Sequence, residues 1–293
     1  MKTKATRNSE NHKITNSPDH KINKSPDHQI TRSPNLAAVF FILLTGCAAV
    51  PAAFTPMQSI GPDQFSYSLF DKVLHEHVRD GMVDYPAIAG DDRFRTYITQ
   101  LDHVDPNAFP TKEERLAFWI NAYNAYAIQG ILDGLSPQTL WGRYKYFIDR
   151  QYRVGGEAVN LYDLERSIIV KNFHEPRIHF AIVCASRSCP RLRSEAYVAT
   201  RLHDQLEDQA REFINDGSRN QFDRGSRVAR LSKIFDWYSG EFRAHSATLV
   251  EYVRPYVNNL DLRGDLDPIR YSVEFLDYDW SLNGTPPVAA RAQ

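Results

Sequence analysis

Two cysteines, Cys184 and Cys189, offer the most visible chemistry in the sequence. They lie five positions apart in the segment VCASRSCPRLR (183–193). Such a close pair forms a disulfide in an oxidising compartment and stays reduced in the cytosol. On the chain-entropy model the bond would stabilise the fold by only about 2 kcal/mol, so its main effect would be to fix the turn at residues 185–188.

Cys189 is also a candidate catalytic nucleophile. Pro190 follows it, and proline favours the first position of a helix. Amides at a helix start and neighbouring cations lower a thiol pKa. His179 is the candidate base. In an extended strand it would lie on the face opposite Cys184, so it would serve Cys189 only if the intervening loop folds back.

A third interpretation assigns the cysteines no reaction of their own. The pair would only shape a pocket for an anionic ligand, lined by the surrounding cations Arg187, Arg191 and Arg193.

The histidines do not make a convincing metal site. His75 and His77 are two positions apart, and helical residues at that spacing face different directions. His174 and His179 would complete a four-ligand set with the two cysteines, but the spacing fits no standard zinc pattern. The sequence therefore predicts no metal and no cofactor.

Two asparagines and a group of aromatic residues are further candidates. Asn121 and Asn124 lie three apart and share a helix face, where they are either hydrogen-bonded core amides or orienting groups in a cleft. For catalysis Asn121 is the residue we select. The aromatic residues belong to the core or form a wall that stacks on a sugar or peptide: Phe235, Trp237, Tyr238, Tyr278 and Trp280.

These residues need helices and a strand to position them. Apolar spacing predicts helices near 65–80, 93–104, 198–215 and 246–256. A capping box, Thr111 with Glu114, and a stop at Gly134 bound the clearest helix, and Asn160 caps another that runs to about Phe173. Gly155-Gly156 predicts a hairpin.

Short strands are expected at 227–231 and 270–276, and the apolar run 178–183 (IHFAIV) has the length of a buried strand. We therefore expect a single α+β domain, with helices flanking a small central sheet built around residues 177–184.

The N-terminal region resembles a bacterial lipoprotein signal. Residues 36–46 (LAAVFFILLTG) are uncharged but too few to span a bilayer, and Leu44-Thr45-Gly46-Cys47 resembles a lipobox. The resemblance implies cleavage before Cys47, acylation of its thiol and an anchor facing the periplasm. Ala48 and Ala49 follow without an aspartate, which favours the outer membrane. With Cys47 acylated, the other two cysteines are a matched pair in an oxidising space.

Residues 14–35 repeat an eight-residue unit with a proline in each copy, and we expect them to be disordered. We interpret them as the translation of repetitive DNA that lies upstream of the true translation start. The expected organisation is a leader and signal (1–46), a tether (47–63), a globular domain (64–283) and a flexible tail (284–293). Without the leader the net charge is −5, which argues against a nucleic-acid partner.

Three segments resemble DUF547, a family named for a domain of unknown function. They are AFWINAYNAYAI (117–128), RIHFAIVCASRSCPRLRSEAY (177–197) and LSKIFDWYSGEF (231–242), with YDWSLN (278–283) as a terminal signature. The resemblance runs from about residue 66 to 283 and implies no assigned activity. The order of helix and histidine-bearing strand is also loosely similar to papain and transglutaminase-like folds, which is a fold-level analogy only.

Two functions from different classes follow. The first is a non-catalytic module for cell-envelope binding or assembly, with a Cys184–Cys189 disulfide and an envelope protein, peptide or glycan as its ligand. The second is a thiol-dependent hydrolase or transferase that uses Cys189 as nucleophile and His179 as base. We favour the first, because an oxidised pair cannot also be a resting nucleophile.

Overall fold

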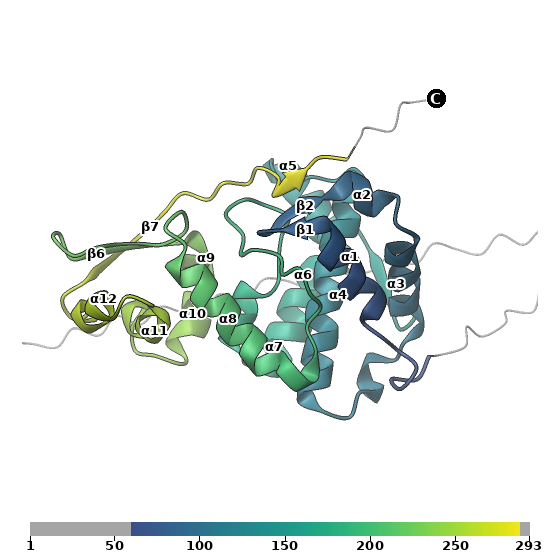
Figure 1. The fold of residues 1–293 in the computed structure, drawn as a ribbon, viewed down its shortest axis with the longest axis horizontal. Coiled ribbons are helices and arrows are strands. Elements are labelled where there is room, and N and C mark those ends of the chain that lie inside the picture. Colours follow the sequence, from purple (N-terminus) through teal and green to yellow (C-terminus); the bar gives the residue numbers. More distant parts are fainter. Residues whose placement is uncertain (1–59, 288–293) are drawn as a thin grey trace, which may run out of the picture. The chain divides into compact units, whose positions relative to one another are not determined.

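The computed structural model describes residues 60–287, which combine many helices with three small sheets (Figure 1). These residues belong to one unit, Thr55–Gln293, and the expected single α+β domain is confirmed. The leader, Cys47, most of the tether and residues 288–293 lie outside the described residues. No helix within 60–287 is both long enough and apolar enough to cross a bilayer.

The helix α4 (Lys112–Leu132) lies at the centre of the larger hydrophobic cluster and is buried on most of its surface. It begins at the predicted capping box, in which the Thr111 hydroxyl accepts from the Glu114 amide and the Glu114 carboxylate accepts from the Thr111 amide. Just past its end, Gly134 adopts a left-handed φ of 82°, as expected of a helix stop.

Shorter helices surround α4. Those on the N-terminal side of the chain are α1 (Ser68–His77), α2 (Tyr85–Ala89), α3 (Asp92–His103) and η1 (Pro106–Ala108). Those that follow it are α5 (Leu140–Tyr144), η2 (Lys145–Asp149), α6 (Leu161–Asp163), η3 (Leu164–Val170) and α7 (Lys171–Phe173). The last three are continuous and are capped by Asn160, as predicted.

A second hydrophobic cluster packs around Phe180, Phe213, Phe235 and Phe242. Its helices are α8 (Leu202–Asn215), α9 (Lys233–Trp237), α10 (Ser239–Arg243), α11 (Leu249–Val253), η6 (Arg254–Tyr256) and α12 (Leu260–Asp265), whereas the short η5 (Ala199–Arg201) before α8 contacts α4. Phe180 belongs to this cluster while its neighbours Ile178 and Ala181 belong to the first. The segment around residue 180 therefore lies where the two clusters meet.

The strands form three separate small sheets. They are β1 (Val78–Arg79), β2 (Met82–Asp84) and β8 (Gly284–Thr285); β3 (Tyr152–Val154) and β4 (Glu157–Val159); and β5 (Gln221–Asp223), β6 (Val228–Leu231) and β7 (Ser272–Phe275). The hairpin at Gly155-Gly156 and the strands at 227–231 and 270–276 are confirmed, and β6 pairs with β7 in parallel. Residues 284–285, expected in the tail, pair instead with β2.

The prediction of a central strand at 177–184 is wrong. Pro176–Phe180 forms the 3₁₀ helix η4, and the chain then turns without pairing into a sheet. Pro176 suits a first helical turn, and the Glu175 carboxylate caps it by accepting from the Arg177 amide. A short apolar run is buried equally well as a helix or a strand, so its hydrophobicity could not decide between them.

Side chains take the place of the missing strand partners. The Asn124 side chain donates to the Ala181 carbonyl at 3.0 Å and accepts from the Val183 amide at 2.9 Å. The side-chain amide of Gln209, in α8, donates to the Phe180 carbonyl at 2.9 Å. Amides from the two flanking helices thus satisfy the buried backbone that leads into Cys184.

Candidate functional site

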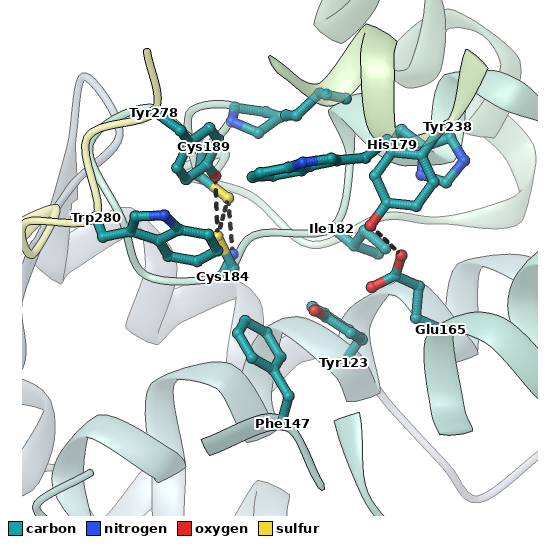
Figure 2. Close-up of a pocket in the computed structure, with 13 residues that line it drawn as sticks. Tyr123, Phe147, Glu165, His179, Ile182, Cys184, Cys189, Tyr238, Tyr278 and Trp280 are labelled. Carbon is teal, nitrogen blue, oxygen red and sulfur yellow. Dashed lines mark hydrogen bonds between the residues drawn. The ribbon is translucent and has the colours of Figure 1, made fainter. Parts of the chain in front are cut away.

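A cavity of about 70 Å³ opens beside the cysteine pair (Figure 2). Four regions of the chain supply its walls: α4 and the helices after it, the 179–190 segment, α9 with Tyr238 just past its end, and the C-terminal segment. The lining residues are Tyr123, Phe147, Glu165, His179, Ile182, Cys184, Cys189, Pro190, Ile234, Trp237, Tyr238, Tyr278 and Trp280. The space accepts a group the size of one side chain rather than a whole sugar or peptide.

Cys184 and Cys189 face each other on one side of this cavity. Both are free thiols in the structure, and their sulfur atoms lie 2.7 Å apart. The backbone amide of Cys184 also donates to the Cys189 sulfur at 2.9 Å. The two residues differ in access, because Cys184 is partly exposed and Cys189 is only 4% exposed.

Two hydroxyl groups surround the Cys184 sulfur. Ser186 Oγ and Tyr278 Oη each lie 3.2 Å from it, and they are 3.0 Å from each other. Burial opposes ionisation of this thiol, but hydrogen bonds from Cys189, Ser186 and Tyr278 outweigh burial and lower the pKa of Cys184. Burial raises the pKa of Tyr278 well above its usual range, so its hydroxyl keeps the proton that it donates.

Cys189 has the opposite electrostatic environment. Burial and the neighbouring Cys184 sulfur raise its pKa well above the usual thiol value. The helix start expected after Pro190 does not form, since residues 190–198 are irregular. The more acidic and more accessible thiol is therefore Cys184, whereas the sequence pointed to Cys189.

The C-terminal segment clamps the loop between the cysteines. The amides of Arg187 and Ser188 donate to the carbonyls of Ser281 and Asp279, and the Asn283 amide donates back to Ala185. Ala185 adopts a left-handed φ of 60°, which turns the chain toward Ser186. Backbone hydrogen bonds from a distant part of the chain thus fix the loop without help from the sulfur atoms.

His179 does not contact either cysteine through a hydrogen bond in the described part of the chain. Its Nε2 lies 2.5 Å from a carboxylate oxygen of Glu241, and its ring stacks on Tyr238 with centroids 3.8 Å apart. Its Nδ1 is buried and has no hydrogen-bond partner among residues 60–287. The predicted pairing with Cys189 assumed a strand and a returning loop, and η4 instead directs the imidazole toward α10.

Beside His179, a second polar group lines the same cavity. The Tyr238 hydroxyl lies 2.5 Å from the buried Glu165 carboxylate, opposite the sulfur pair in Figure 2. Arg166 lies 3.3 Å from Glu241 and its guanidinium covers the Tyr238 ring at 4.4 Å. Burial and Glu165 raise the pKa of Tyr238 well above its usual range, so this hydroxyl stays protonated.

The two asparagines have structural partners. Asn121 exchanges hydrogen bonds with the backbone of Tyr197, at 2.7 and 2.9 Å, and does not line the cavity. A catalytic role for Asn121 receives no support from this position. Asn124 has the stronger connection to the thiols, since it holds the backbone just before Cys184.

Arg187 and Arg191 line one cavity, but Arg193 does not, and the carboxylates of Asp216, Asp277 and Asp279 line the same cavity. Arg191 pairs with Glu212 at 2.9 Å and with Asp216 at 3.4 Å, while Arg193 pairs with Glu195 at 2.5 Å. Arg187 is exposed on the clamped loop. Because carboxylates already neutralise two of the cations, a free anion would have to displace them.

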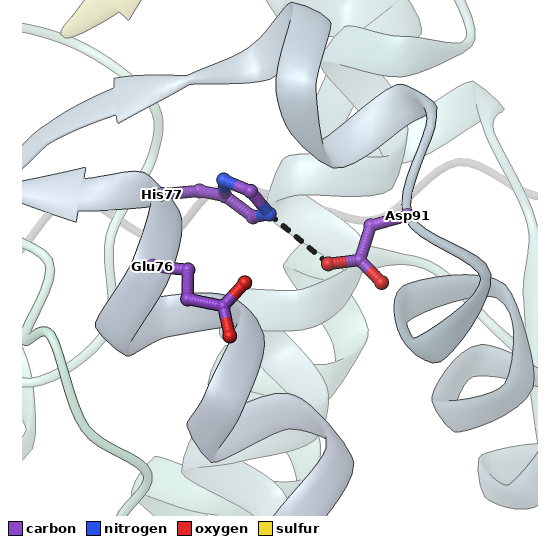
Figure 3. Close-up of side chains that lie close together, drawn as sticks. All are labelled: Glu76, His77 and Asp91. Carbon is purple, nitrogen blue, oxygen red and sulfur yellow. Dashed lines mark hydrogen bonds and ion pairs between the residues drawn. The ribbon is translucent and has the colours of Figure 1, made fainter.

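Glu76, His77 and Asp91 place three potential metal ligands within 4.8 Å of one another (Figure 3). His77 Nε2 lies 3.0 Å from Asp91, but the Arg93 guanidinium lies 2.6 Å from both carboxylates. The arginine already supplies the positive charge that these acids hold, and it lowers the pKa of Asp91. His174 lines a different cavity from the cysteines, so the four-ligand set with His179 does not assemble.

The aromatic residues of the two C-terminal motifs divide between core and cavity. Phe235 is fully buried in the second cluster, whereas Trp237 is 42% exposed and lines the cavity with Tyr278 and Trp280. Sequence reasoning identified this aromatic group but not the roles of Ser186, Tyr278 and Glu241 as partners of the candidate residues. The sequence signal that could have indicated these roles is the presence of Glu241 in the motif 231–242 and of Tyr278 in the motif 278–283.

Comparison with known proteins gives one result. No curated protein and no solved structure matches the chain. The family model described as "Protein of unknown function, DUF547" matches residues 107–214, which include α4, η4 and both cysteines. Trp237, Tyr238, Tyr278 and Trp280 of the cavity lie beyond the matched range. The similarity to DUF547 is therefore shown for residues 107–214 of the chain.

Proposed function

We propose that this protein is a lipoprotein of the bacterial outer membrane, anchored through Cys47 and facing the periplasm, and that its domain is a non-catalytic module for envelope binding or assembly. In this proposal a Cys184–Cys189 disulfide closes the loop beside the cavity. The ligand is an envelope protein, peptide or glycan that inserts one side group between the aromatic residues.

The contact of the two sulfur atoms carries the proposal. At 2.7 Å they are about 0.7 Å farther apart than the roughly 2.05 Å of a disulfide, so bonding requires only a small side-chain movement. Export through a lipoprotein signal would bring this pair into an oxidising space, where it loses its two thiol hydrogens. The loop that the bond closes is the one clamped by the C-terminal segment.

The surface beside the loop supports a binding role. Trp280 packs against Trp237 and Tyr278, with centroids 5.8 and 4.6 Å apart, and the Arg143 guanidinium lies 4.5 Å above its ring. Exposed aromatic rings stack on peptide or sugar faces, and a nearby cation strengthens contact with polar groups.

The test has two parts. The full chain, expressed with its own signal and isolated without reductant, is expected to incorporate labelled palmitate at Cys47 and to show no free thiol after unfolding. A Cys47→Ala variant is expected to lose the label and to leave the membrane fraction. Two free thiols in the isolated protein, or unchanged labelling of the variant, would contradict the proposal.

Ligand binding is tested by tryptophan fluorescence with peptidoglycan fragments and with unstructured envelope peptides. Trp237→Ala is expected to weaken binding at least about tenfold, as for a central aromatic contact. Trp141→Ala is the matched control, since Trp141 is also exposed but does not line the cavity. Equal loss in both variants would remove the cavity as the binding site.

The alternative is a thiol-dependent hydrolase or transferase with Cys189 as nucleophile and His179 as base. It receives less support, because Cys189 is the buried thiol with the raised pKa and His179 is held by Glu241. Carbamidomethylation that abolishes a hydrolytic activity, together with its loss in Cys189→Ser but not in Cys184→Ser, would restore this alternative.

A further inference from the structure

The two thiols of the cavity differ in ways that a static cross-link does not need. One is accessible and surrounded by hydroxyl donors, and the other is buried against the backbone amide of the first. We propose that Cys184 and Cys189 form a thiol–disulfide exchange site for disulfide-bonded polypeptides, in which Cys184 attacks and Cys189 resolves. This inference rests on one part of the proposed function, the disulfide-forming pair in an oxidising compartment, and it replaces the non-catalytic role of that pair with a redox reaction.

Cys184 has the geometry of an attacking thiol. It is the more exposed of the two, and the hydroxyls of Ser186 and Tyr278 lie within hydrogen-bond distance of its sulfur. Because the Ser186 hydroxyl donates to Tyr278, the Tyr278 hydroxyl is free to donate to the sulfur, and this bond stabilises a thiolate much more than a neutral disulfide sulfur. The hydrogen bonds at this sulfur lower the pKa of Cys184 against the effect of burial, which raises the thiolate fraction near neutral pH.

Cys189 has the geometry of a resolving thiol. Both cysteines line the cavity, but Cys189 is only 4% exposed whereas Cys184 is partly exposed, so an incoming disulfide meets Cys184 more readily. Its sulfur lies 2.7 Å from that of Cys184, which places it in position to displace a group bonded there. Its raised pKa keeps it protonated until the mixed disulfide forms.

Fixing the loop is not a sufficient reason for the pair. Four backbone hydrogen bonds already hold residues 185–189: three join them to the segment 279–283, and the Cys189 amide donates to Ser186. A bond across five positions adds only about 2 kcal/mol on the chain-entropy model. The loop is therefore held without a disulfide, whereas the hydrogen bonds to the Cys184 sulfur contribute to its reactivity.

The reaction proceeds in two balanced steps. The Cys184 thiolate attacks one sulfur of the substrate disulfide, forms a mixed disulfide, and releases the other substrate sulfur as a thiolate. Cys189 then attacks the Cys184 sulfur, the Cys184–Cys189 bond forms, and the second substrate sulfur leaves. The proton of Cys189 passes to a departing thiolate. The substrate gains the two electrons that the protein dithiol loses, and the reverse sequence oxidises a substrate dithiol.

The cavity favours a polypeptide as the source of the disulfide. Its volume of about 70 Å³ accepts one cysteine side chain, and the partly exposed rings of Trp237, Tyr278 and Trp280 provide a surface for the flanking residues. A small charged disulfide such as oxidised glutathione would use little of that aromatic surface.

The experiment uses the full-length lipoprotein in detergent, with Cys184 and Cys189 reduced. The probe is a fluorescent, unstructured decapeptide that contains one intramolecular disulfide. Cys189→Ser is expected to accumulate a reductant-sensitive adduct of one peptide per protein. Cys184→Ser is the matched control and is expected to react at least about a hundredfold more slowly, because its remaining thiol is buried and protonated.

Wild-type protein is expected to release reduced peptide and to become oxidised at the pair. In a Cys189→Ser background, Tyr278→Phe is expected to slow capture about threefold at pH 7, since a higher thiol pKa reduces the thiolate fraction more than it increases nucleophilicity. Thermal unfolding of each variant establishes that it is folded before its rate is compared.

Three results would overturn the inference. The first is faster capture of the peptide by Cys184→Ser than by Cys189→Ser. The second is capture by folded Cys189→Ser that is no faster than capture by the unfolded chain. The third is an equal rate of reaction with oxidised glutathione and with the peptide, which would remove the polypeptide specificity. If the isolated wild type contains the disulfide but Cys189→Ser captures nothing, the proposed function stands and the exchange activity is lost. If the pair cannot be oxidised at all, both fail.

Discussion

Two polar groups, each with three residues that line one cavity, organise their charges in different ways. The thiol wall (Cys184, Cys189, Ser186 and Tyr278) places a second thiol and two hydroxyls around one partly exposed sulfur, and the Ser186 hydroxyl also donates to Tyr278. The histidine wall (His179, Glu241, Tyr238 and Glu165) pairs each polar group with another, His179 with Glu241 and Tyr238 with Glu165. Mutual pairing stabilises a structure, whereas convergence on one atom prepares that atom for reaction.

The largest expected effect tests whether the histidine wall is structural. His179→Ala removes a buried ring stacked on Tyr238 and the partner of Glu241, so the free energy of unfolding should fall by about 3 kcal/mol. His179→Phe retains the ring and should cost only about 1 kcal/mol. Urea denaturation measures both, and the alkylation rate of Cys184 should stay unchanged. A folded His179→Ala protein with an inert Cys184 would contradict the comparison.

The next prediction compares two buried amides of α4. Asn124→Ala and Asn121→Ala each leave one buried backbone amide and one carbonyl without a partner, and each should lower the free energy of unfolding by about 2 to 3 kcal/mol. Only Asn124 holds the segment that enters the thiol wall. Asn124→Ala should therefore also change the alkylation rate of Cys184 in the folded protein, and an equal change in Asn121→Ala would show that the effect is general.

A smaller effect distinguishes two tyrosines on opposite walls. Tyr278→Phe removes a donor that stabilises the Cys184 thiolate, so the pKa of this thiol should rise and the pH midpoint of its reaction with iodoacetamide should move upward. Tyr238→Phe removes a hydroxyl bound to Glu165 and should leave that midpoint unchanged. Stability should change by only about 1 kcal/mol in either protein. Equal midpoints for Tyr278→Phe and the wild type would show that Tyr278 does not stabilise the Cys184 thiolate.

The smallest effect lies outside both walls, at Glu195. Burial opposes its ionisation, but hydrogen bonds from Arg193, Arg201 and Gln205 lower its pKa to about 2. Because the folded-state pKa is below the unfolded value of about 4.3, the stabilisation is present above pH 4.3 and is lost as the pH falls toward 2. In Glu195→Gln the free energy of unfolding should depend less on pH between about 4.3 and 2, and the alkylation rate of Cys184 should not change. This result is expected if Arg193 has a structural role rather than a role in anion binding.

Local signals in the sequence predicted most of the elements. The capping box at Thr111, the cap at Asn160 and the hairpin at Gly155-Gly156 each depend on residues within a few positions of one another, so their geometry follows from short-range chemistry. The strand at 177–184 failed because a buried apolar run does not specify its own hydrogen-bond partners. Those partners are Asn124 and Gln209, on helices far away in the chain.

The candidate site shows the same limit. Spacing identified the cysteine pair, and its partly exposed aromatic neighbours were recognised as a group. The lower pKa of Cys184 depends in part on Tyr278, which lies 94 residues beyond it, and the loop between the cysteines is held by residues 279–283. No pattern within the segment 183–193 contains that information, and so the nucleophile inferred from local cations was Cys189.

The long separation between Cys184 and Tyr278 has a consequence for biosynthesis. A chain made and exported from its N-terminus exposes both cysteines well before Tyr278 and the clamping segment emerge. During that interval the pair lacks its hydroxyl partner and the backbone that shapes its loop. Oxidation during export would therefore occur before the site has folded. Whether oxidation comes before or after folding of residues 278–283 would determine whether the protein first folds as a disulfide or as a dithiol.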